Sequence, residues 1–172
     1  MENNKNLKYG VIGFLSFLVL LGLDQGTKYL AETRLKGSAG VPLIPGVLEF
    51  QYLENAGAAW GILQNKQLFF YMLTVPFVIF LIWVFFRIPQ KRRYLGLHII
   101  SIMLLAGAIG NLIDRLRLKY VIDFIYFKLI NFPIFNVADI YVVISIALFF
   151  VLIMFFYKDE ELHFLSRKKK EA

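Results

Sequence analysis

The sequence of 172 residues contains no cysteine and only two histidines. Without cysteine, the chain has no disulfide, no thiol nucleophile and no cysteine metal ligand. His98 and His163 both fall on the side of the predicted topology opposite to the aspartates described below, which argues against a Ser-His relay there. The sequence also lacks an H-E-x-x-H zinc motif, a G-x-S-x-G nucleophile motif and a glycine-rich phosphate loop. Hydrolytic chemistry in this chain would therefore depend on carboxylates.

Charged residues are scarce as well. They make up 18% of the chain, against 59% hydrophobic residues, a balance typical of membrane proteins. The formal net charge is +7, but the basic residues flank apolar runs, which points to membrane topology and anionic lipid headgroups rather than to nucleic acid. At this length we expect one domain, no cofactor, no nucleic-acid partner and a monomer.

Four apolar segments are long enough to cross a bilayer as helices, at about residues 9–30, 68–86, 94–113 and 137–157. They predict an all-α polytopic membrane protein, a single membrane domain of residues 1–172 with outer loops at 31–67 and 114–136 and a cytoplasmic tail at 158–172. Pro76 lies inside the second span, which membrane helices tolerate. After Gly46, residues 48–52 alternate with a period of two, so the first outer loop is expected to carry a small β-strand element.

The distribution of basic residues predicts the orientation. Most Lys and Arg residues lie in the N-terminal segment, in the connection 87–93 and in the tail, including the run 167–170. The positive-inside rule places these three segments in the cytoplasm. In this orientation Asp24 and Asp114 at the ends of the first and third spans, Asp139 at the start of the fourth, and Asp123 between the last two all reach the outer face. The long loop with Asn55 reaches it too, and Trp60 in that loop could lie at headgroup level. One polar site at the outer surface is the economical interpretation.

Several of these residues also have a purely structural explanation. Asp24 and Lys28 are four residues apart on one helix face and can form a simple ion pair. Asn136 and Asp139 have the spacing of an N-cap residue and the third residue of a helix. From spacing alone a helix cap is as good an explanation as catalysis, although a cap leaves Asp139 free for a second role.

The third span and the segment after it contain the other candidates. Gly107, Asn111 and Asp114 or Arg115 share one helix face, where they could form a packing seam with a hydrogen bond to a neighbouring helix. Asp123 is harder to explain structurally, because apolar and aromatic residues flank it on both sides. Burial there would raise the pKa of its carboxyl, which suits a group that shares a proton near neutral pH.

Five short motifs follow one another along the chain: Asp24-Gln25-Gly26-Thr27-Lys28, Asn55-Ala56-Gly57-Ala58-Ala59-Trp60, Gly107-Ala108-Ile109-Gly110-Asn111-Leu112-Ile113-Asp114-Arg115, Val121-Ile122-Asp123-Phe124-Ile125 and Phe135-Asn136-Val137-Ala138-Asp139. In this order, and with four spans, they resemble the motifs of lipoprotein signal peptidases (signal peptidase II), which are bacterial membrane aspartyl peptidases. The resemblance covers essentially the whole chain. Ala56 and Ala106 depart from it at positions where the family often has proline and glycine.

The resemblance implies a catalytic dyad of Asp123 and Asp139, a choice that the residues alone leave open among four aspartates. It further implies residues that line, brace or support the site: Asp24, Lys28, Asn55, Gly57, Asn111, Asp114, Arg115 and Asn136. The implied reaction removes the signal peptide from a diacylglyceryl-modified prolipoprotein at the outer face of the bacterial cytoplasmic membrane, in contact with membrane lipids. Two adjacent carboxylates that share a proton would activate the attacking water. Residues 41–61 would cradle the polar part of the substrate.

Two other functions are considered. A small non-enzymatic membrane carrier or assembly subunit could use the outer carboxylates for ions or protons, but ionisable residues at mid-span and repeated halves, which such a protein would show, are not apparent. A lipid-headgroup phosphotransferase would need a metal site. The spacing of Asp114, Asp123 and Asp139 leaves such a site open, and insensitivity to a strong chelator would remove it.

Overall fold

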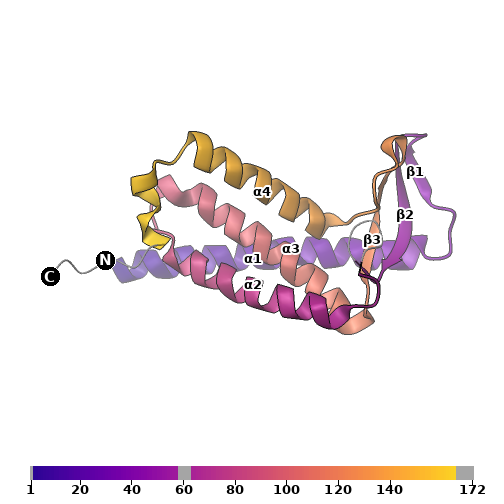
Figure 1. Ribbon diagram of the computed structural model, residues 1–172, viewed down its shortest axis with the longest axis horizontal. Coiled ribbons are helices and arrows are strands. Elements are labelled where there is room, and N and C mark those ends of the chain that lie inside the picture. The colour runs from indigo at the N-terminus through magenta and orange to yellow at the C-terminus, as the bar shows by residue number, and fades with distance from the viewer. Residues whose placement is uncertain (1, 58–62, 166–172) are drawn as a thin grey trace.

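In the computed structural model, which describes residues 2–57 and 63–165, four long helices lie side by side and a small sheet closes one end (Figure 1). The helices are α1 (Glu2–Leu35), α2 (Gln67–Arg87), α3 (Leu95–Leu118) and α4 (Val137–Phe155). All four are long and apolar enough to cross a membrane. The predicted fold class, four transmembrane helices with a small β element, is confirmed. The expectations for Trp60 and for the basic run 167–170 concern residues outside those described.

Helix α3 is the centre of the bundle and packs against α1, α2 and α4. In its apolar stretch 39% of the residues are buried in the protein, against 11–17% in the other three. The outward surfaces of the other helices carry exposed large apolar side chains, such as Leu73 and Phe150. In lipid this exposure carries no hydrophobic cost, so tight packing of small residues becomes the main contribution to helix association.

Two helices extend beyond the spans expected from hydropathy. Helix α1 continues to Leu35 instead of ending near residue 30, so Asp24 lies well inside it rather than near its C-terminus. Helix α3 continues to Leu118 instead of ending near residue 113, and Lys119 ends it with a left-handed backbone conformation (φ 69°). Asp114 therefore lies in the last turns of a helix and not in a loop.

The sheet contains β1 (Val41–Ile44), β2 (Leu48–Asn55) and β3 (Val121–Phe127), antiparallel in the order β1-β2-β3. The period-two pattern predicted only β2. Ile122 and Phe124 of β3 are buried against Ala31 and Leu35 at the end of α1. This contact places β3 directly over the end of the bundle.

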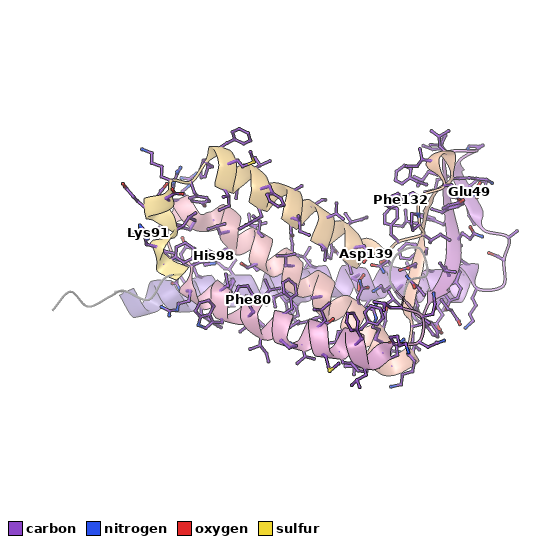
Figure 2. All side chains as sticks on the ribbon, viewed as in Figure 1. Glu49, Phe80, Lys91, His98, Phe132 and Asp139 are labelled. Atoms are coloured by element: carbon purple, nitrogen blue, oxygen red, sulfur yellow. The ribbon has the colours of Figure 1, made fainter. Side chains whose placement is uncertain are left out.

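The opposite end of the bundle is closed by two short 3₁₀ helices, η2 (Arg92–Tyr94) and η4 (Asp159–Leu165). The Arg93 guanidinium joins them by donating from Nε to Glu161 Oε1 at 2.9 Å. Figure 2 shows His98 near this end and Asp139 near the sheet. His163 belongs to η4, so both histidines are distant from the aspartates at the sheet.

Candidate active site

Asp123 lies in the middle of β3, where the neighbouring strand places an asparagine beside it. Its side chain is 2% exposed. Asn55, the last residue of β2, donates from Nδ2 to Asp123 Oδ2 at 2.8 Å, and Asn136 donates from Nδ2 to Asp123 Oδ1 at 2.7 Å. Both carboxylate oxygens of Asp123 therefore accept a hydrogen bond from a side-chain amide.

Asp139 lies in the first turn of α4 and takes part in a capping box. The Asn136 side chain accepts from the Asp139 backbone N–H at 3.1 Å, and Asp139 Oδ2 accepts from the Asn136 backbone N–H at 3.1 Å. The predicted helix cap is thus confirmed, and it orients Asp139. Because Asn136 also binds Asp123, one asparagine holds both carboxylates in place.

Asn111 of α3 completes the connection. Its Nδ2 donates to Asp139 Oδ1 at 2.9 Å, and its Oδ1 accepts from Asn136 Nδ2 at 3.2 Å. The amide orientation of Asn111 is thus fixed from both sides. The two aspartates and the two asparagines form one hydrogen-bonded network that draws on β3, α3 and α4.

Both aspartates line a cavity of about 500 Å³, within the size range of small-molecule binding sites. Polar groups occupy one part of its wall, whereas most of the lining is apolar and comes from β3, α4 and the segment 130–135. The lining residues are Asn55, Gly57, Asn111, Arg115, Val121, Asp123, Phe127, Ile130, Phe132, Pro133, Ile134, Phe135, Asp139, Ile140 and Val143. Such a wall can accept an apolar chain and present a polar bond to the two carboxyl groups.

Burial and a neighbouring charge perturb the titration of Asp123, which lies outside the membrane-spanning helices. Burial first, and the negative charge of Asp139 second, raise the pKa of Asp123 to about 7. The hydrogen bonds from Asn55 and Asn136 act in the opposite direction because they favour the carboxylate. At neutral pH, Asp123 can therefore hold a proton or release it.

Arg115 contributes the positive charge on the cavity wall. Its Nη2 donates to the Gly57 carbonyl at 3.2 Å, and its guanidinium lies over the Phe70 ring at 4.3 Å. The Gly57 N–H in turn donates to Asn55 Oδ1 at 3.0 Å. Arg115 thus fixes the backbone that follows Asn55, and Asn55 is one of the two residues that donate hydrogen bonds to Asp123.

Asp24, Lys28 and Asp114 are also brought together, but beside the cavity rather than on its wall. The Lys28 Nζ lies 3.1 Å from Asp24 Oδ2 and 2.9 Å from Asp114 Oδ2. The ion pair expected from the spacing of Asp24 and Lys28 is confirmed, with Asp114 as a second partner. The Asp114 carboxylate therefore points to Lys28 and not to Asp123 and Asp139. In residues 2–57 and 63–165, no group of three or more His, Cys, Asp or Glu side chains is placed to hold a metal ion.

Reasoning from the sequence missed Gln25 as a member of this cluster. Its Nε2 donates to Asp24 Oδ2 and to Asp114 Oδ1, both at 3.1 Å. A glutamine next to an aspartate has no distinctive spacing, so no local signal could have identified it. The apolar cavity wall from Ile130 to Phe135 was also not anticipated, because it is formed only when the β3–α4 connection folds back onto β3, where Phe135 pairs with Ile125.

The sequence and the fold were compared with known protein families, sequences and solved structures. The family model described as signal peptidase (SPase) II matches residues 16–156. The chain is 45% identical to a lipoprotein signal peptidase of Caldanaerobacter subterraneus over 84% of its own length and 95% of the relative's, and 39% identical to one of Enterococcus faecalis over 82% and 86%. A solved structure described as a bacterial membrane enzyme superposes with a TM-score of 0.74 at 33% identity, covering 94% of both chains.

Proposed function

The chain belongs to the signal peptidase II family, and from this membership we propose that it removes the signal peptide from diacylglyceryl-modified prolipoproteins with Asp123 and Asp139 as its catalytic dyad. One observation carries the choice of residues. The two carboxyl groups line the same cavity and are both held by Asn136. Every group that the chemistry requires comes from one chain, so a monomer suffices.

The proposed reaction needs one proton shared by the dyad. Asp123, with its raised pKa, carries this proton in the resting enzyme, and Asp139 accepts a proton from the attacking water. The water oxygen bonds to the carbonyl carbon of the scissile amide while Asp123 protonates the carbonyl oxygen. The proton on Asp139 then passes to the leaving nitrogen, the C–N bond breaks, and Asp123 regains its proton from the tetrahedral intermediate. The enzyme ends in its starting protonation state.

The cavity wall suggests how such a substrate is placed. Ile140 and Val143 extend the wall along α4 into the apolar part of the helix, which suits the apolar end of a signal peptide and its lipid. The polar groups at the sheet end would then face the scissile amide. Arg115 and Gly57 support the β2 end of the cavity, where residues 41–61 would cradle the polar part of the substrate; residues 58–61 of this predicted cradle lie outside those described.

Purified protein should cleave a lipidated prolipoprotein and leave the same precursor without its diacylglyceryl group essentially uncut. The apolar wall along α4 would pack against the chains of the diacylglyceryl group, and a precursor without this group leaves that part of the cavity unfilled. Gel mobility and mass spectrometry of the product measure the cut, and a strong chelator should leave the rate unchanged. Equal cleavage of both precursors would contradict the proposed substrate class.

We also propose that both termini face the cytoplasm and the sheet faces outward, because the basic residues concentrate at the end opposite to the sheet. The chain has no cysteine, so single cysteines report their own side of the membrane. In intact cells a membrane-impermeant maleimide should label Ala39→Cys, exposed near the sheet, and should label Lys91→Cys, exposed at the other end, only after permeabilisation. The reverse pattern would invert the topology.

The pH dependence follows from Asp123. Because the reaction needs its proton, kcat/KM should fall above pH about 7, approaching a ~10-fold loss per pH unit. Asn55→Ala removes a hydrogen bond that favours the carboxylate, so the pKa of Asp123 rises and the alkaline limb should move up by about half to one unit. Gln51→Ala, an exposed amide on the same strand, is the control. An alkaline limb that stays in place or moves down in Asn55→Ala would contradict the assignment.

The same shift predicts a stability effect of definite sign. Between the unfolded pKa of 3.8 and the folded pKa of about 7, the folded protein holds a proton that the unfolded chain has released. The contribution of Asp123 to the free energy of unfolding therefore decreases as pH rises through this window.

The comparisons do not support the alternative of a non-enzymatic carrier, because the matched relatives are named as peptidases.

A further inference from the structure

Lys28 is a buried cation whose three donor positions are all occupied. Its side chain is 2% exposed, and Nζ contacts Asp114 Oδ2 at 2.9 Å, Asp24 Oδ2 at 3.1 Å and Asn111 Oδ1 at 2.8 Å. Burial of one cation with two anions is expensive, and such clusters often add little net stability. The role of the cluster of Asp24, Lys28 and Asp114 is therefore better judged from the segments that it binds than from its contribution to stability.

Each of the two carboxylates also binds a backbone N–H immediately before a dyad residue. Asp24 Oδ1 accepts from the N–H of Ala138 at 3.0 Å, and Ala138 precedes Asp139 in the chain. Asp114 Oδ2 accepts from the N–H of Ile122 at 3.2 Å, and Ile122 precedes Asp123. The residues that donate these hydrogen bonds are themselves buried, Ala138 at 0% and Ile122 at 3% exposure.

The third contact of Lys28 reaches the dyad through a side chain. The Asn111 oxygen accepts from Lys28, so its Nδ2 is directed to Asp139 Oδ1 at 2.9 Å. A flipped Asn111 would place its amide hydrogens against the ammonium and its oxygen against the carboxylate. The positive charge of Lys28 therefore fixes the direction of the hydrogen bond that Asp139 receives.

From these contacts we propose that Lys28 is a positioning residue: with Asp24 and Asp114 it clamps the first turn of α4 to the start of β3 and so sets the separation of the two dyad carboxyl groups. The inference rests on the proposed function, since it assigns a role in that reaction. Lys28 does not line the cavity, so it acts through the segments it holds. Gln25 reinforces the clamp by donating to both carboxylates.

The test must separate positioning from the balance of buried charge. Lys28→Met alone leaves two buried carboxylates without their cation, which is destabilising. The double variant Asp24→Asn/Lys28→Met removes one charge of each sign, keeps the net charge of the cluster, and retains an oxygen for the Ala138 N–H. Lys36→Met is the matched control, because Lys36 is exposed and its Nζ pairs with a single carboxylate, that of Glu54.

Full-length proteins are purified in detergent, their thermal unfolding is recorded, and kcat and KM are measured on lipidated prolipoprotein over a range of pH. The double variant is expected to unfold cooperatively, with kcat lowered roughly 10- to 100-fold, as a misplacement of about 1 Å produces, and with KM within about threefold of wild type. The positive charge of Lys28 also lowers the pKa of Asp123, so its removal should move the alkaline limb to higher pH, and the fall in kcat is the readout that reports positioning. Lys36→Met should match wild type in all three quantities.

A folded double variant with the kcat of wild type would overturn the proposal, because a cluster without its buried cation would then position the dyad equally well. A double variant without cooperative unfolding would also overturn it, since Lys28 would then serve folding rather than positioning. The proposed function is judged separately, by the rate of the wild-type protein in the same assay.

Discussion

Asp123→Asn and Asp139→Asn are each expected to lower the rate of prolipoprotein cleavage by at least ~10³-fold, the scale seen when a residue that carries protons in the chemical step is removed. Asparagine has the volume of aspartate but can neither hold the shared proton nor accept one from water. At position 123 there is a further effect. Both oxygens accept from amide N–H groups of Asn55 and Asn136, so an asparagine there places its own NH₂ against one of these donors.

The measurement is single-turnover cleavage of lipidated prolipoprotein, with thermal unfolding to show that each variant is folded. Asp159→Asn is the matched control, because Asp159 is exposed in η4 at the opposite end of the bundle, and it should cleave within about twofold of wild type. A folded variant at 123 or 139 that cleaves at the wild-type rate would remove that residue from the dyad. The search would then move to Asp114 and Asp24.

Local patterns in the sequence predicted the elements that depend on local interactions. Hydropathy located four spans, a period of two located part of β2, and the spacing of Asn136 and Asp139 gave the capping box that the structure contains. Hydropathy could not give the ends of α1 and α3. It follows the thickness of the hydrocarbon layer, whereas a helix can continue as long as its residues tolerate helical geometry.

Strand β3 could not be recognised because Val121, Ile122, Asp123 and Phe124 are all buried. A strand covered on both faces reads as a continuous apolar run without alternation. Its partner β2 lies far away in the sequence, with Asn55 opposite Val121. The sequence showed that Asp123 sits in apolar surroundings but not that Asn55 lies beside it.

The choice among four aspartates likewise required the structure or a family resemblance. In the predicted topology all four reach the outer face, so their position along the chain does not single out a pair. In the structure Asp24 and Asp114 are bound to the buried Lys28, whereas Asp123 and Asp139 line the cavity. What separates the two pairs is the position of one ammonium group, which comes from α1.

A single methyl group at Gly107 is expected to disable the enzyme by displacing the helix that carries Asp139. A Cβ at this position of α3 would lie 2.7 Å from the carbonyl oxygen of Ala138 and 2.9 Å from Val142 Cγ2. A side chain could rotate away, but the carbonyl belongs to the first turn of α4 and cannot. Gly107→Ala must therefore push α4 outward at the residue before Asp139, which strains the hydrogen bonds from Asn111 and to Asp24.

We expect Gly107→Ala to cost about 1–3 kcal/mol of stability, the usual range for overpacking, and to lower the melting temperature by roughly 3–10 °C. Cleavage should fall much further, by about 10²-fold, since catalysis tolerates displacement less than folding does. Gly26→Ala is the matched control. Within residues 2–57 and 63–165, no atom apart from the neighbouring backbone of α1 lies within 4 Å of the added methyl group, and alanine favours a helix by about 1 kcal/mol over glycine. If Gly107→Ala cleaves and melts like wild type, α3 and α4 are packed less closely at this point than the contacts of Gly107 indicate. A loss of activity confined to Gly107→Ala shows instead that the dyad depends on the close approach that this glycine allows.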